Sequence, residues 1–194
     1  MRSPQVELRP SSEGRPSQGL GWQLTSSPRV VEHSGGAPGC GAMLRLLPDH
    51  GVAVAALANG GDMAGLFTTV YDELLGELAG VNLPQPPPVP EPAPVDDPDR
   101  YCGTYALRTQ VTDVTADGSG RLWLTRQERN EAATLAALAG AGLQAEVREL
   151  RRLDGQRFAC VDADGRLAGA VEFIETDSEG RARYVHSGRA APRV

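Results

Sequence analysis

The chain has 194 residues, of which 40% are hydrophobic and 23% charged, so it is long enough for one large folded domain or two small ones. Its net charge of −6 argues against a nucleic-acid partner, which requires a basic surface. No apolar run approaches the roughly 20 residues that span a bilayer. All 19 basic residues are arginines, which excludes a catalytic lysine within this chain.

The N-terminal residues are polar and contain no apolar segment typical of a secretory signal. The 3 cysteines are odd in number and lack the spacing of metal ligands, which is typical of free thiols in a reducing compartment. Both features favour a cytoplasmic location, and neither a metal nor a cofactor is expected.

Four short apolar segments bounded by turn residues predict strands near the N-terminus: 19–24, 30–33, 42–47 and 52–58. The last is apolar throughout, which predicts a strand buried on both faces. Apolar residues then recur at helical spacing from Met63 to Leu78, with Asp62 as the N-cap and Gly80 as the C-cap. One helix covers one face of a sheet, so we expect this region to need a partner, such as a second copy that self-associates through the exposed sheet.

A proline-rich stretch then divides the chain. Eight of the 17 residues in 82–98 are proline, which excludes helix interiors and central strands and favours an extended spacer. We therefore predict a domain over residues 1–81, a linker over 82–98 and a second domain over 99–194.

Seven segments predict strands in the second domain: 101–107, 111–115, 121–125, 146–153, 157–161, 168–175 and 182–187. Asp-Gly and Glu-Gly pairs between them are typical of hairpin turns, so a small antiparallel barrel is expected. Residues 130–141 are rich in Ala and Leu and fit either a short helix or an irregular connection. The predicted fold class is α+β: a partial antiparallel sheet with a C-terminal helix, followed by an all-β antiparallel barrel.

The segment His33-Ser34-Gly35-Gly36 carries the clearest chemical signal. Two adjacent glycines weaken a strand unless a ligand or another backbone must come close. A strand amide can donate to an oxyanion, and a histidine and a serine hydroxyl can hold a carboxylate or pass a proton. The segment therefore predicts a strand edge on which an acyl group docks. A histidine beside glycines is more often an ordinary turn or core residue, and the pattern alone leaves that alternative open.

The order of motifs resembles the C-terminal part of a family of serine hydrolases. The family is that of the class C β-lactamase-like, D-alanyl-D-alanine carboxypeptidase-like enzymes. The chain resembles it in three successive segments: Gly19–Trp22, residues 33–39 and the predicted hairpin at 44–51. The resemblance covers about residues 19–80 and implies an incomplete β-lactamase-like domain. The proline-rich stretch followed by Tyr101–Tyr105 resembles the lipocalin-like barrel that many of these hydrolases carry.

The resemblance also implies roles for single residues. His33, Ser34 and Gly35 match the third motif of the family, Lys/His-Ser/Thr-Gly, whose first residue lines the active site electrostatically. The Ser34 hydroxyl would help to hold the substrate carboxylate, and the Gly36 amide would be one of two oxyanion-hole donors. The substrate would be a small molecule with an amide, ester or β-lactam bond.

Two motifs of the family are absent from the chain. The nucleophile motif Ser-x-x-Lys cannot occur without lysine, and the arginine of a Ser-x-x-Arg segment cannot act as the base. The second motif, Tyr-x-Asn, is also missing. We therefore expect the nucleophile, the base and this tyrosine to lie upstream of Met1, and the chain to be inactive alone. Two other functions stay open: a non-catalytic small-molecule or protein binding module built on the barrel, and a decayed protein without activity.

Two interpretations fit the segment Cys160–Gly165: a calcium-binding loop or a plain hairpin turn. The segment is close to an EF-hand loop, but a cysteine occupies the first ligand position and the twelfth position is Val171. These departures favour an ordinary Asp-Gly hairpin turn.

Overall fold

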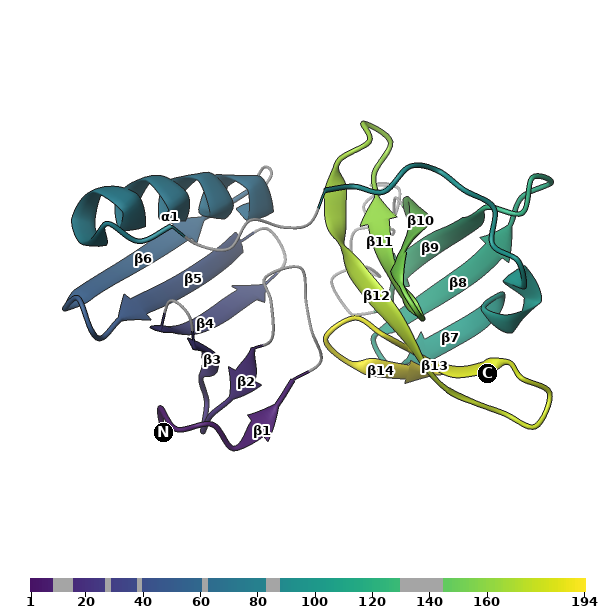
Figure 1. Cartoon of the computed structure of the whole chain (residues 1–194), viewed down its shortest axis with the longest axis horizontal. Helices are drawn as coiled ribbons and strands as arrows, with labels where there is room; N and C mark the ends of the chain where they lie inside the picture. Colours follow the sequence, from purple (N-terminus) through teal and green to yellow (C-terminus); the bar gives the residue numbers. More distant parts are fainter. Residues whose placement is uncertain (9–15, 27–28, 38–39, 61–62, 83–87, 130–144) are drawn as a thin grey trace. The chain divides into compact units, whose positions relative to one another are not determined.

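The computed structural model describes residues 1–8, 16–26, 29–37, 40–60, 63–82, 88–129 and 145–194 (Figure 1). The chain divides into two compact units, Met1–Pro87 and Pro88–Val194, and the boundary falls inside the proline-rich stretch. Each unit has its own antiparallel sheet and its own buried core. No helix in the described part of the chain is long and apolar enough to cross a membrane.

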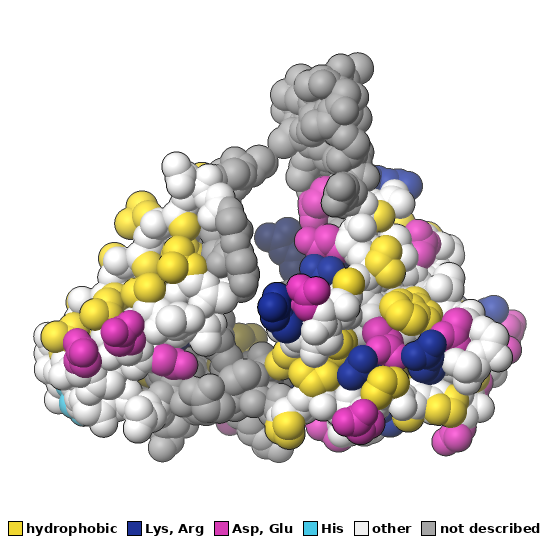
Figure 2. Space-filling model, turned by 90° about the horizontal axis from the view of Figure 1, so that it is seen from above, with side chains coloured by type: hydrophobic (Ala, Val, Ile, Leu, Met, Phe, Trp, Pro, Cys, Tyr) yellow, Lys and Arg dark blue, Asp and Glu magenta, His cyan; other side chains and the backbone are white. Residues whose placement is uncertain are grey.

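The first unit is a six-stranded antiparallel sheet in which each strand pairs with the next along the chain. Its strands are β1 (Val6–Glu7), β2 (Ser17–Gln18), β3 (Gln23–Ser26), β4 (Arg29–Ala37), β5 (Cys40–Leu47) and β6 (Val52–Ala58). Helix α1 (Met63–Ala79) follows and packs on β5 and β6 (Figure 1). The outward surface on this side of the first unit carries hydrophobic and acidic side chains next to one another (Figure 2). The helix ends as predicted at Gly80, whose φ of 64° lets the Val81 amide donate to the Leu75 carbonyl. The expected N-cap, Asp62, lies outside the described residues.

The two faces of this sheet differ in burial. Tyr71 and Leu75 of α1 pack against Leu47 and Val54, and all four side chains are buried. Successive strand residues point to opposite faces, so Leu57 of β6 points away from the helix, and its side chain is 80% exposed. The prediction that 52–58 is buried on both faces is therefore wrong. Helix α1 covers one face of β6, and the residues described here leave the other open.

The second unit is an eight-stranded antiparallel sheet, again with each strand paired to the next. Its strands are β7 (Gly103–Leu107), β8 (Gln110–Ala116), β9 (Leu122–Glu128), β10 (Glu146–Asp154), β11 (Arg157–Val161), β12 (Leu167–Thr176), β13 (Ala182–His186) and β14 (Ala190–Pro192). A bridge between Tyr105 and Arg193 joins the last strand to the first, and the Val194 amide donates to the Thr104 carbonyl at 3.0 Å. The sheet thus closes as an up-and-down barrel. The alternatives left open for 130–141 concern residues outside the description.

Aromatic side chains fill the barrel. Tyr101, Tyr105, Phe158 and Phe173 are all buried, and their rings contact one another with centroids 4.8–5.8 Å apart. A short 3-10 helix, η1 (Pro98–Arg100), precedes β7 and brings Tyr101 into this core. These aromatic side chains therefore pack the interior of the barrel at the end near η1.

The expected α+β class is wrong. Strands account for 52% of the described residues, and α1 is the one α-helix among them, so the chain is almost entirely antiparallel β. The amphipathic pattern of Met63–Leu78 does form a helix, but this one helix of 17 residues covers only part of one sheet. The polar segment 2–18 also contributes the short strands β1 and β2, which were not expected.

Candidate functional site

The four residues of the predicted motif lie together on β4. His33, Ser34, Gly35 and Gly36 are all exposed. Strand β5 pairs with the whole of this segment along one side. Strand β3 lies on the other side, but its register ends where Gln23 pairs with Glu32. The described part of β3 therefore stops one residue before His33 and leaves an open strand edge beside the motif.

The open edge presents backbone hydrogen-bonding groups. Residues of an antiparallel strand direct their N–H and C=O groups alternately to one neighbour and then to the other. Two of the four residues from His33 to Gly36 therefore direct these groups away from β5, toward the open edge. Such groups are satisfied by solvent or by a ligand that lies alongside the strand.

The surroundings of the two glycines of the motif differ in whether they leave room for a side chain. A Cβ atom at Gly36 would lie 3.3 Å from the Cys40 carbonyl oxygen, so the tight hairpin between β4 and β5 favours glycine there. A Cβ atom at Gly35 would meet nothing within 4 Å. Packing within the described chain therefore explains Gly36 but not Gly35, where the space beside the backbone is available to a ligand.

His33 and Ser34 point to opposite faces of the sheet, because they are neighbours in a strand. Ser34 pairs with Met43 on the face that carries α1. The His33 ring lies on the other face, where the edge of the Trp22 ring approaches it with centroids 6.3 Å apart. The strand brings the two side chains to the same stretch of edge, and they would approach a ligand from its two sides.

A buried polar network lies beside the motif, and the sequence reasoning missed it. Glu32 and Arg45 are paired residues on β4 and β5, both are buried, and Arg45 Nε donates to Glu32 Oε2 at 2.7 Å. The Arg45 guanidinium lies 4.8 Å from the centre of the Tyr71 ring. The Tyr71 hydroxyl donates to the Met43 carbonyl at 2.5 Å, and burial raises the pKa of this phenol. Helix α1 is thereby fixed to the strand that pairs with Ser34.

The three cysteines differ in exposure: Cys40 is exposed, Cys102 is partly buried and Cys160 is buried. Burial raises the pKa of Cys160 to about 11, so its thiol is a poor nucleophile. Burial also raises the pKa of Cys102. The described parts of the chain contain no group of three His, Cys, Asp or Glu residues placed to hold a metal ion.

Comparison with known proteins gives similarities both in sequence and in structure. No family model matches the chain. Penicillin-binding protein 4 of Amycolatopsis lactamdurans is 43% identical to it over 91 residues, which is 45% of this chain and 23% of that protein. This similarity relates the chain to penicillin-binding proteins and β-lactamases, and the chain spans about a quarter of the relative's length.

Among solved structures, SurE is similar with a TM-score of 0.58 and 25% identity, over 92% of this chain and 38% of SurE. A structure of SurE with D-Leu has a TM-score of 0.61 and 24% identity, over 92% of this chain and 39% of that one. Both units of the chain therefore share their folds with part of one longer protein.

Proposed function

We propose that the chain supplies the substrate-docking strand edge of a serine acyl hydrolase related to penicillin-binding proteins. The observation that carries this proposal is the open, exposed edge of β4 at His33–Gly36, on the residues that match the third motif of that family. The attacking serine, its lysine base and the tyrosine of the second motif would be supplied by sequence outside these 194 residues. The similarity to penicillin-binding protein 4 supports the same assignment.

In this proposal the edge binds and polarises the acyl group. The carbonyl of an amide, ester or β-lactam would lie beside β4, and the Gly36 amide would donate to its oxygen as the serine attacks and negative charge develops there. The Ser34 hydroxyl would hold the substrate carboxylate, and His33 would line the opposite side of the edge. The tetrahedral intermediate would expel the leaving group with a proton, and water would then release the acyl group from the serine.

The exposed sheet face fits the same proposal. Leu57 of β6 is 80% exposed, and Ala53 and Ala55 beside it on the same face are also exposed. Folded monomers rarely leave a wide apolar face in water. Further sequence of the same hydrolase, packed on this face, would cover these side chains and bring the missing catalytic residues toward the edge.

A chimera tests the proposal. The segment of penicillin-binding protein 4 that is equivalent to residues 19–80 would be replaced by residues 19–80 of this chain, and acylation by a fluorescent penicillin would be followed. We expect the chimera to be acylated and the 194-residue chain alone not to be. Within the chimera, Ser34→Ala should slow acylation at least tenfold, whereas Thr69→Ala on the exposed side of α1 should leave the rate unchanged.

Two outcomes would contradict the proposal. One is a folded chimera, verified by its thermal unfolding, whose acylation rate is the same with Ser34→Ala or His33→Ala as without them. The other is stoichiometric labelling of the unmodified chain, which would show that a nucleophile and base are already present.

A further inference from the structure

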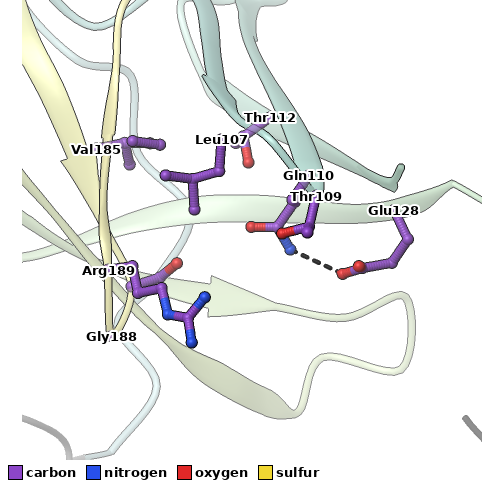
Figure 3. A pocket seen from close by; sticks show the side chains of 10 residues that line it. Leu107, Thr109, Gln110, Thr112, Glu128, Val185, Gly188 and Arg189 are labelled. Carbon is purple, nitrogen blue, oxygen red and sulfur yellow. Dashed lines mark hydrogen bonds between the residues drawn. The ribbon is translucent and has the colours of Figure 1, made fainter. Parts of the chain in front are cut away.

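The second unit has a pocket at the end of the barrel away from η1. The turn between β7 and β8 and the turn between β13 and β14 frame it (Figure 3). Its volume is about 320 Å³, at the lower end of the range for small-molecule sites, which commonly occupy the mouths of β-barrels. The pocket borders the barrel core, with which it shares Val185 and Ala191.

The pocket has an apolar side formed by residues of β7, β13 and β14. Leu107, Val185 and Ala191 line it, and Val185 and Ala191 are buried. Leu107 and Val185 lie next to each other in Figure 3. These side chains offer a ligand hydrocarbon contact rather than hydrogen bonds.

The remaining lining is polar and includes an arginine. The Arg189 side chain extends into the pocket from the β13–β14 turn (Figure 3), and the described residues provide no ion pair for it. Across the pocket, Glu128 accepts a hydrogen bond from Gln110 Nε2 at 3.0 Å. The Arg189 guanidinium is thus the group in the lining that is placed to meet an anion.

A second guanidinium lies behind the lining. Arg126 Nη2 donates to the hydroxyl of Ser187, a lining residue, at 3.0 Å. Arg126 Nε is buried and has no hydrogen-bond partner among the described residues. Arg126 and Arg189 outweigh the negative charge of Glu128, and the carboxylate of Glu146, opposite Arg126, is itself paired with Arg148. The pocket and its surroundings therefore favour an anionic group.

We propose that this pocket binds a small organic carboxylate with an apolar chain. The carboxylate would accept hydrogen bonds from the Arg189 guanidinium, whose planar donor geometry suits it. The chain would lie against Leu107 and Val185. The site lies wholly within the second unit and does not depend on the hydrolase function proposed for the first.

The test is a titration of the full 194-residue chain followed by two-dimensional ¹H–¹⁵N NMR. The probe is 4-methylpentanoate, compared with 4-methylpentanamide, which lacks the charge, and with acetate, which lacks the apolar chain. We expect shift changes concentrated in 107–112 and 185–191, and at least tenfold tighter binding of 4-methylpentanoate than of either comparison compound. Equal affinity for the acid and the amide, or no saturable shifts at these residues, would overturn the proposal.

Matched variants separate recognition from folding. Arg189→Gln should weaken 4-methylpentanoate binding about tenfold and leave the affinity for 4-methylpentanamide unchanged. Arg166→Gln, at an exposed arginine of the β11–β12 turn, should leave both affinities unchanged. The dispersion of the spectrum shows whether each variant is folded. An Arg189→Gln protein that is folded and binds the carboxylate as tightly as the original chain would refute the assignment.

Discussion

The two units use the same strand order and differ in how their sheets end. In each, every strand pairs with the next along the chain. The second sheet returns on itself through the Tyr105–Arg193 bridge, so its first and last strands are paired. Among the described residues, the first sheet stays open, and β4 is paired on only one side over His33–Gly36. Closure satisfies backbone groups within the unit, whereas an open edge leaves them available to another molecule. The proposed acyl site lies at the unpaired edge of β4 in the sheet that does not close.

The units also differ in where their apolar side chains lie. In the barrel, inward-facing residues of all strands share one core, and side chains such as Phe158 and Leu124 are at most 1% exposed. In the first unit, the core that α1 covers lies on one face; on the other face Leu24 and Val31 are buried, whereas Leu57 is 80% exposed. Within the described residues, the second unit thus gathers its apolar side chains in one core, whereas the first leaves apolar side chains of one sheet face exposed.

Replacing Arg193 tests whether the stability of the barrel depends on its seam, the junction between β14 and β7 at the Tyr105–Arg193 bridge. The Arg193 guanidinium donates to the carbonyls of Ala182, Arg100 and Cys102 and to the Tyr105 hydroxyl. Because Arg193→Met removes several charge-assisted hydrogen bonds at once, we expect the unit to lose about 4 kcal/mol of unfolding free energy. Urea unfolding followed by Trp123 fluorescence, in a Trp22→Phe background, measures this.

The control for the seam is an arginine outside it. Arg183 makes one exposed ion pair with Glu175 at 3.3 Å, so Arg183→Met should cost less than about 1 kcal/mol. Equal losses in Arg193→Met and Arg183→Met would show that the seam does not hold the barrel closed, and the contrast between the units would fail.

The buried pair of the first unit provides the matching experiment there. Glu32→Gln removes the carboxylate charge that accepts from the buried Arg45 guanidinium, and we expect a loss of about 3 kcal/mol. The double change Glu32→Leu with Arg45→Met should recover most of this loss, because it removes both charges and retains the volume. Unfolding followed by Trp22 in a Trp123→Phe background reports it. A double variant no more stable than Glu32→Gln would contradict this account of the pair.

Local patterns predicted most of the strands. The predicted and observed limits agree for 52–58 and 157–161, where apolar runs end at turn residues. The strand β14 was missed because its three residues, Ala190–Pro192, carry no periodicity and include a proline. Its place depends on Arg193 and Tyr105, which are 88 residues apart, and local sequence gives no sign of such a contact.

The sequence predicted where the hairpin turns lie but not their hydrogen-bonding pattern. Three hairpins share the pattern Asp-x-x-Gly-Arg, at Asp117–Arg121, Asp162–Arg166 and Asp177–Arg181. In each, the aspartate side chain accepts hydrogen bonds from the amides two and four residues later. The glycine of each pattern has φ near 80°. The interpretation of Cys160–Gly165 as a turn rather than a calcium loop agrees with this structure. The recurring Asp-x-x-Gly-Arg pattern could have predicted the form of all three turns.

The candidate site was predicted in part for a similar reason. Adjacent glycines on a strand identified His33–Gly36, whereas the open edge depends on where β3 stops pairing. The Glu32–Arg45 pair could have been found, because the two residues are equally far from the Ala37–Cys40 pair at the end of the hairpin, and antiparallel pairing places them opposite each other. The roles of His33, Ser34, Gly35 and Gly36 stay predictions.

The exposed face of the first unit predicts a substitution with little effect on stability. Because the Leu57 side chain is 80% exposed, Leu57→Ser should change the unfolding free energy by less than about 0.5 kcal/mol. If the face drives self-association, the same change should reduce the sedimentation-equilibrium mass at high protein concentration. Leu75→Ala, on the covered face, should cost about 3 kcal/mol and serves as the comparison. A cost for Leu57→Ser as large as that for Leu75→Ala would show that the open face is in fact packed.

The smallest effect is a pH dependence located in the barrel turns. Hydrogen bonds from the side chains of Ser119 and Trp123 hold the pKa of Asp117 well below its usual range. A carboxylate with a depressed folded-state pKa stabilises the fold above its unfolded value of about 3.9, and this contribution is lost as the pH falls below that value. Asp117→Asn should therefore lower Tm at pH 6, and the difference should shrink as the pH falls from about 4 toward 2. The exposed carboxylate of Asp96 supplies the control, since Asp96→Asn should leave the profile unchanged. A Tm difference between the original chain and Asp117→Asn that is constant from pH 6 to pH 2 would mean that the ionised carboxylate does not hold this turn.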